Sequence, residues 1–176
     1  VLAQIRRLDE RVRDLLVYSR KVSLNVESVE PSVLIQSTLA LLSEEPLLRE
    51  VETHVAVAPR IGTHPMDRGQ MQEVLVNLIR NAATAMEGTG ALYIQAERRE
   101  GGVLALIVED TGPGVPPEKL EEIFTPFVTT RPEGTGLGLA IARRTLEAHG
   151  GSLVCQRGAR GARFVASLPP LFGREG

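Results

Sequence analysis

Residues 67–86 read DRGQMQEVLVNLIRNAATAM, and this stretch predicts the longest helix of the chain. Its apolar residues recur at helical spacing and form one broad arc, so the helix should lie against a core. The arc comprises Met71, Val74, Leu75, Leu78, Ile79, Ala82, Ala85 and Met86. Asp67 is a favourable N-cap, and Gly88 and Gly90 would end the helix.

A stripe of polar residues borders that arc. Glu73, Asn77, Asn81 and Thr84 are spaced by four, four and three residues, so they share one face of the helix. Asparagine is a mediocre helix former, and two asparagines in this register need a reason. Nearby backbone could satisfy both amides. Alternatively, they line a ligand site and offer an amide oxygen to Mg²⁺. The helix alone favours neither interpretation.

The rest of the pattern predicts an α+β domain, a two-layer sandwich in which one mixed sheet carries helices on one face. The predicted elements are helices over 31–43, 67–86 and 136–149, and strands over 51–57, 91–99, 102–109, 152–157 and 162–168. Gly101-Gly102 suits a hairpin turn between two of these strands. Residues 110–136 form a long loop around a short helix near 117–123, and such a loop is usually functional or mobile.

Two glycine-rich motifs flank that loop. Asp110-Thr111-Gly112-Pro113-Gly114-Val115 follows a strand, where the glycines allow close approach of a flat ligand and Asp110 could accept a purine amino proton. Taken alone, a tight turn is the better interpretation. Gly134-Thr135-Gly136-Leu137-Gly138-Leu139 opens a helix, where exposed N–H groups favour an anion.

Neither motif is a dinucleotide fingerprint or a Walker loop. Leu139 stands where the fingerprint requires glycine, and the only two lysines, Lys21 and Lys119, do not follow a glycine. A charged phosphate contact would therefore come from arginine, for which Arg131 is the candidate.

Four motifs in order resemble the N, G1, F and G2 boxes of sensor histidine kinases. They are Asn77-x-x-x-Asn81, Asp110-x-Gly-x-Gly, Phe124-x-Pro-Phe127 and Gly134-x-Gly-x-Gly-Leu, and the resemblance covers about residues 60–168. The run Phe127-Val128-Thr129-Thr130-Arg131 is most similar to the nitrogen-regulation type. The resemblance implies a Bergerat fold that binds ATP or ADP with Mg²⁺ under a lid.

The same resemblance assigns roles to individual residues. Asn81 would hold Mg²⁺, Asn77 would support it near the phosphates, and Asp110 would take the adenine amino group. Asn77 and Arg131 are the candidate catalytic residues. The nucleotide contacts that we expect are Asn77, Asn81, Asp110, Gly112, Gly114, Phe127, Thr130, Gly134, Thr135, Gly136, Leu137 and Gly138.

Two features depart from the family pattern. The motif with the acceptor histidine is absent, and His54, His64 and His149 do not replace it: we expect a strand, a loop and a helix end at these positions. Ala162 stands where many relatives have a threonine that helps to bind adenine. The expected function is transfer of the ATP γ-phosphate to a histidine on a separate dimerisation domain, for relay to a response regulator.

Three other functions compete with this one. ATP-driven clamps of the gyrase, mismatch-repair or chaperone kind hydrolyse ATP with a glutamate where this chain has Asn77, which cannot act as a base. The chain could instead be a non-catalytic ATP-binding module. A serine kinase of the anti-sigma type is disfavoured by the helical segment that ends Tyr18-Ser19-Arg20.

That N-terminal segment resembles the end of a dimerisation and phosphotransfer helix. Residues 1–22 carry a narrow apolar seam, namely Ile5, Leu8, Val12 and Leu15, which favours pairing with another helix and a homodimeric parent protein. We expect a connector at 23–30, the ATP-binding domain at 31–172 and a tail at 173–176.

Composition limits the remaining possibilities. The net charge of −2 and the 3% aromatic content disfavour a nucleic-acid partner. The single cysteine, Cys155, excludes an internal disulfide and suits a reducing compartment. We expect a cytoplasmic domain whose parent protein is either membrane-anchored or not.

Overall fold

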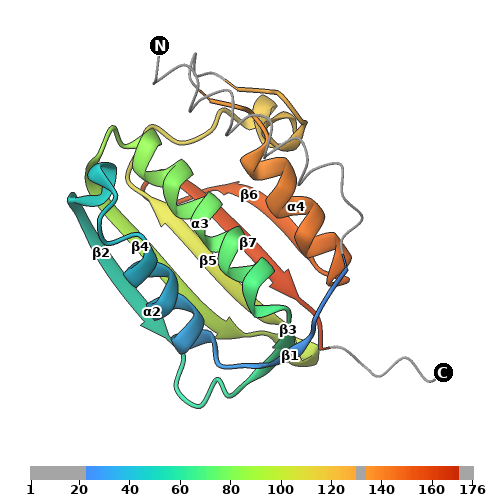
Figure 1. Cartoon of the computed structure of the whole chain (residues 1–176). Helices are drawn as coiled ribbons and strands as arrows, with labels where there is room; N and C mark the ends of the chain where they lie inside the picture. The colour runs from blue at the N-terminus through green and yellow to red at the C-terminus, as the bar shows by residue number, and fades with distance from the viewer. Residues whose placement is uncertain (1–22, 130–133, 171–176) are drawn as a thin grey trace, which may run out of the picture.

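A five-stranded mixed sheet with helices on one face forms the body of the molecule (Figure 1). The computed structural model describes residues 23–129 and 134–170. The sheet has the order β2-β4-β5-β7-β6, with β2 at Glu50–Val57, β4 at Thr89–Arg98, β5 at Leu104–Asp110, β6 at Ser152–Arg157 and β7 at Ala162–Leu168. The helices are α2 (Pro31–Leu41), α3 (Arg68–Ala85) and α4 (Gly138–Ala148). The α+β sandwich predicted from the sequence is confirmed.

Strand pairing places β5 at the centre of the sheet. β2 runs parallel to β4, whereas β4–β5, β5–β7 and β7–β6 are antiparallel. All seven residues of β5 are buried. Glu100–Gly102 forms the predicted turn between β4 and β5, and Gly101 and Gly102 adopt positive φ angles there. Asp110, the last residue of β5, is therefore held by the most protected strand.

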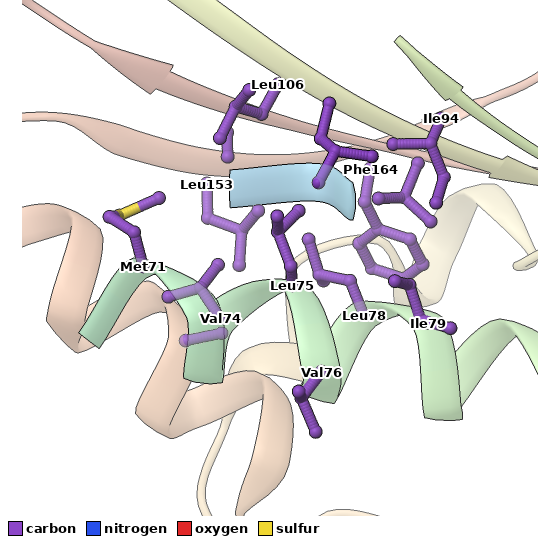
Figure 2. Packing of buried hydrophobic residues seen from close by; sticks show 14 of the residues in the cluster. Met71, Val74, Leu75, Val76, Leu78, Ile79, Ile94, Leu106, Leu153 and Phe164 are labelled. Atoms are coloured by element: carbon purple, nitrogen blue, oxygen red, sulfur yellow. The ribbon is translucent and has the colours of Figure 1, made fainter. Parts of the chain in front are cut away.

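The core lies between α3 and the sheet. Figure 2 shows Leu75 and Leu78 of α3 pointing toward the sheet, from which Leu106 and Phe164 point back. These four side chains are at most 1% exposed. Burying a side chain of this size contributes roughly 1.5–3 kcal/mol to stability, with the unfolded chain as reference. Because the apolar arc of α3 packs on the sheet, the polar stripe lies at the border of this buried face.

Both ends of α3 follow the sequence signals. Asp67 has extended backbone angles, and its side chain accepts a hydrogen bond from the Gln70 N–H. The helix ends at Ala85, and Gly88 follows with φ +79°. A glycine in this left-handed conformation lets the chain turn into β4 without steric cost.

Three details differ from the sequence-based expectation. The segment near 117–123 forms two short 3₁₀ turns, Pro117–Lys119 and Glu122–Phe124, because so short a segment forms few α-helical hydrogen bonds. The helix expected from about residue 136 begins at Gly138, since Gly136 has φ +69°. His64 lies in a short strand, β3 (His64–Met66), and not in a loop.

A two-stranded ribbon ties the connector to the domain. β1 (Glu27–Val29) pairs antiparallel with β3. The expected helix over 1–22 and the tail at 173–176 lie outside the described residues. Within the part that the structure describes, no helix is both long and apolar enough to span a bilayer.

Candidate functional site

Asp110 closes β5 as a buried carboxylate. It is 1% exposed, and its Oδ1 accepts hydrogen bonds from the Gly112 N–H at 2.8 Å and the Ala162 N–H at 3.2 Å. The adjacent β7 strand therefore holds Asp110 through its main chain at Ala162. These two hydrogen bonds fix the orientation of the carboxylate. A fixed orientation is what a hydrogen-bond acceptor for a flat ligand needs.

Glycines surround this carboxylate because no side chain would fit. A Cβ on Gly112 would lie 3.0 Å from Asp110 Oδ1 and 3.3 Å from the Ala85 backbone. A Cβ on Gly161 would lie 2.5 Å from both Oδ1 and the main-chain oxygen of Asp110. Sequence reasoning named Gly112 but missed Gly161 as a site residue. The sequence does mark this glycine, since Gly161 ends the turn between the last two strands, directly before the strand that faces Asp110.

One face of α3 connects this carboxylate with the second glycine motif. A Cβ on Gly138, the first residue of α4, would lie 3.4 Å from Asn77 Oδ1. Asn81 follows one turn later and is half-buried, and Ala85 one turn further packs against Gly112. From Asn77 to Ala85 the helix rises roughly 12 Å, a span comparable to that from the base to the phosphates of a nucleotide.

The start of α4 is a candidate anion site. Leu137 precedes the helix and provides no side-chain cap, so the amides of the first turn have no partner from that residue. Leu137 itself is buried, and its N–H donates to Thr135 Oγ1 at 3.3 Å. Gly134 and Thr135 lead into this turn.

A close contact joins the two ends of the loop before α4. The Phe127 N–H donates to the Gly136 carbonyl at 3.0 Å, and a Cβ on Gly136 would lie 2.6 Å from the Phe127 carbonyl carbon. Phe127 adopts φ +67°, and its side chain is 62% exposed. Thr130 and Arg131, two of the predicted contacts, lie outside the described residues.

Phe124 anchors the same loop to the body of the domain. It is buried, and its ring meets Phe164 of β7 edge-on with centroids 6.4 Å apart. The Arg143 guanidinium of α4 lies 5.1 Å from the Phe124 ring centroid and donates to Glu121. The Glu121 hydrogen bond is the main reason why the pKa of Arg143 lies above its usual value.

The predicted residues do not all share one cavity. A cavity of about 460 Å³ adjoins the site, and among the described residues Gly114 is the only predicted contact that lines it. Its other lining residues are Pro113, Val115, Pro116, Pro117, Arg157, Gly158, Ala159, Arg160 and Gly161. Asp110, Asn77 and Asn81 instead lie along α3 and the end of β5.

The cysteine and the histidines are structural or exposed. Burial, and next the Asp110 carboxylate, raise the pKa of the Cys155 thiol to about 12, so it stays protonated at neutral pH. His54 lies in β2 and stacks on Tyr93. His64 and His149 are buried, with 1% and 2% exposure. Burial disfavours both as phosphate acceptors.

Comparison with known proteins agrees with this geometry. Residues 66–171 match the family described as histidine kinase-, DNA gyrase B- and HSP90-like ATPases. The chain belongs to this ATPase family. The match spans α3, both glycine motifs and four strands of the sheet, β4 to β7, so it contains every predicted contact residue.

The relatives of this ATPase domain are sensor kinases. Sensor histidine kinase ZraS of Escherichia coli O157:H7 is 35% identical over 170 residues, which is 96% of this chain and 37% of ZraS. The structure of full-length ShkA with AMPPNP has a TM-score of 0.82 and 32% identity, over 92% of this chain and 35% of ShkA. ThkA in complex with the response regulator TrrA has a TM-score of 0.82 and 28% identity, over 96% of this chain and 48% of that one. The chain thus spans about a third of the length of ZraS.

Proposed function

We propose that this chain is the catalytic domain of a sensor histidine kinase, which binds ATP and transfers its γ-phosphate to a histidine on a helical partner domain. One observation carries the proposal: α3 links a buried carboxylate at Asp110 to an uncapped helix start at Gly138, along a face that carries Asn77 and Asn81. The sensor kinases among its relatives support it.

The residues present fit a nucleotide. Asp110 would accept the adenine amino proton, and Gly112 and Gly114 leave room for the ring beside it. The amides of Gly134, Thr135, Gly136, Leu137 and Gly138 would bind the phosphates, with Phe127, Thr130 and Arg131 from the preceding loop. Charge-assisted bonds from arginine and from helix-start amides are the strong kind for phosphate.

The residues present also fit Mg²⁺ held jointly with the nucleotide. Among residues 23–129 and 134–170, no group of three or more His, Cys, Asp or Glu side chains could hold a metal by itself. Mg²⁺ commonly binds through one or two protein oxygens, nucleotide phosphates and water. Asn81 would supply the amide oxygen, and Asn77 would support the phosphates. The metal, when bound, would neutralise charge on the transferred group.

Catalysis here consists of positioning. Phosphoryl transfer requires the nucleotide, its metal and an oriented nucleophile. Asn77 cannot deprotonate water, because an amide has no basic site at neutral pH. We therefore expect slow hydrolysis and a nucleophile that another domain provides.

Transfer of label from ATP tests the function. The chain alone should neither label itself nor hydrolyse γ-labelled ATP at a useful rate. A separate domain that carries the acceptor histidine of the same kinase should become labelled, and Asn81→Ala should abolish this by removing the metal ligand. Fast hydrolysis would instead favour a gyrase-like clamp. Strong self-labelling, labile to acid and stable to base, would place an acceptor histidine in this chain and contradict our interpretation.

The Asp110→Asn variant tests nucleotide recognition. Loss of a hydrogen bond to a charged group should weaken ATP binding by about 1.5–3 kcal/mol in calorimetric titration. Glu109→Gln is the matched control, because the neighbouring Glu109 binds Arg163 on the opposite face of the sheet. Equal affinity of Asp110→Asn and the unaltered chain would contradict the adenine role.

The wider assignments rest on the same proposal. We infer a homodimeric parent protein that joins residues 1–22 to the phosphoacceptor helices, with 23–30 as connector, 31–172 as catalytic domain and 173–176 as tail. A response regulator would receive the phosphate, in the cytoplasm. The run from Phe127 to Arg131 supports the nitrogen-regulation type among sensor kinases.

A further inference from the structure

The connector before α2 is fastened to the first turn of α3. The Asn25 N–H donates to Asp67 Oδ2 at 2.8 Å, and the Gln70 side chain donates to the Ser23 carbonyl at 2.8 Å. The β1–β3 ribbon fastens the next residues, where Ser28 Oγ donates to Thr63 Oγ1 at 2.7 Å. From Ser23 onward, the connector is therefore bonded to the domain.

Asp67 is also joined to the end of α4. Its N–H donates to His149 Nε2 at 3.0 Å, and His149 Nδ1 lies 2.8 Å from the Thr145 carbonyl oxygen. A carbonyl only accepts, so Nδ1 carries the proton and Nε2 is the acceptor. The main chain of Asp67 thus binds α4, while its carboxylate caps α3 through Gln70 and binds the connector.

These contacts and the candidate nucleotide site lie at opposite ends of one helix pair. Gly138 at the start of α4 lies beside Asn77, and His149 just beyond the end of α4 binds Asp67 just before α3. The two helices are thus antiparallel, with α4 lying beside the first half of α3 (Figure 1). A displacement of the connector at Asp67 would be carried along both helices to the site.

We propose that Asp67 and His149 are positioning residues that make the connector, α3 and α4 one rigid unit. This inference rests on the proposed function. It implies that residues 23–30 move together with the helices and contain no hinge. Phosphoryl transfer should then need Asp67 and His149 when the acceptor domain is attached through the connector, and should not need them when that domain is added as a separate molecule.

Conservative variants separate the individual bonds. Asp67→Ser keeps a good helix cap but is too short to reach the Asn25 N–H. His149→Asn keeps a donor for the Thr145 carbonyl and removes the acceptor for Asp67. His149→Gln is its matched control, because the longer amide can present an oxygen near the position of Nε2. Gln70→Ala removes the side-chain bonds to the Ser23 carbonyl and to Asp67 Oδ2 and leaves the core intact.

The test compares two formats of the kinase. In one, the acceptor domain is joined to this chain in a single polypeptide through the connector, and in the other it is supplied separately. Asp67→Ser and His149→Asn should slow transfer at least tenfold in the joined format and less than twofold in the separate format, with the KM for ATP unchanged. His149→Gln should restore the joined rate, and Gln70→Ala should fall between.

Two results would overturn the inference. Unchanged transfer in the joined format would show that the bonds at Asp67 position nothing, and an equal loss in both formats would show a purely structural role. Hydrogen exchange provides a readout that does not depend on transfer: the Asn25 amide should exchange at least tenfold faster in Asp67→Ser. Absence of transfer in both formats of the unaltered kinase would refute the proposed function, and exchange at Asn25 would then decide by itself whether the rigid unit exists.

Discussion

Single residues around Asp110 control the shape of the site. A methyl group on Gly161 would overlap two oxygens of Asp110 and approach the Gly112 carbonyl oxygen to 2.8 Å. We expect Gly161→Ala to destabilise the fold by about 1–3 kcal/mol, the usual cost of overpacking. It should also weaken ATP binding at least tenfold, as measured by calorimetry.

Gly69→Ala is the control for that substitution. A Cβ at Gly69 would meet only Asp67 Oδ1, at an ordinary 3.6 Å. Its ATP affinity should match that of the unaltered chain, and its stability should be equal or up to about 1 kcal/mol higher, because alanine is the better helix former. A Gly161→Ala variant that binds ATP normally would show that the β6–β7 turn does not shape the adenine pocket.

His64 makes stability depend on pH. Burial, and next the charge of Arg98, lower the pKa of this imidazole from 6.5, since Arg98 Nη1 donates to Nδ1 and only Nε2 can carry the proton toward the Pro169 carbonyl. Below pH 6.5, His64 binds a proton in the unfolded chain but stays neutral in the folded chain until the lower folded pKa is reached. The free energy of unfolding should therefore fall as pH drops from 6.5 toward the lower folded pKa.

Urea titrations between pH 7.5 and 5 would measure this effect. The slope of unfolding free energy against pH should decrease in His64→Gln, which has no imidazole to protonate. Asp67 affects stability in a lower pH range than His64 does. Burial alone would raise the pKa of Asp67, but the Gln70 and Asn25 amides lower it below 3.8. Its contribution to the free energy of unfolding is therefore lost only as the pH falls below 3.8 toward the folded pKa. An identical slope in His64→Gln would contradict the role of His64.

At the scale of elements, the contact between Phe127 and Gly136 fixes the base of the loop before α4. Gly136→Ala combines a positive φ with a Cβ only 2.6 Å from the Phe127 backbone. We expect faster hydrogen exchange at the Phe127 amide and roughly tenfold weaker ATP binding, because the phosphate-binding turn must shift.

Gly101→Ala separates backbone strain from steric overlap. Gly101 has the same φ of +69°, and a Cβ there would meet nothing within 4 Å. It should lose about 1–2 kcal/mol of stability, the cost of a left-handed alanine, with normal ATP affinity. Equal ATP affinities in the two variants would mean that the contact does not shape the phosphate site.

Local signals explain which elements could be predicted from the sequence. The helix from Asp67 was predictable because its cap, its apolar arc and its terminal glycines all agree. The segment near 117–123 was not, since it has no side-chain cap and is too short for an apolar period to distinguish one helix from two 3₁₀ turns. His64 was placed in a loop because its partners, Arg98 and Pro169, are distant in sequence. Proximity of Gly161 to Asp110 depends likewise on the pairing of β5 with β7.

At the scale of the whole molecule, the helix expected over residues 1–22 remains a prediction. Its seam should pair with a second copy of the chain. Analytical ultracentrifugation should detect a weak dimer that Leu8→Glu abolishes, because a charge in the seam would lose its hydration. Lys21→Glu, outside the seam, is the control. A strict monomer at high concentration would contradict the prediction.

The strand order has a consequence for how copies of the molecule behave in concentrated solution. β2 and β6 end the sheet, so each has one side without a neighbouring strand among the described residues. Such edges can template intermolecular pairing and aggregation. Glu50 and Glu52 are exposed on β2 and would bring like charges together if two copies met along this strand. We therefore expect the carboxylates of β2 to disfavour self-association through this edge of the sheet.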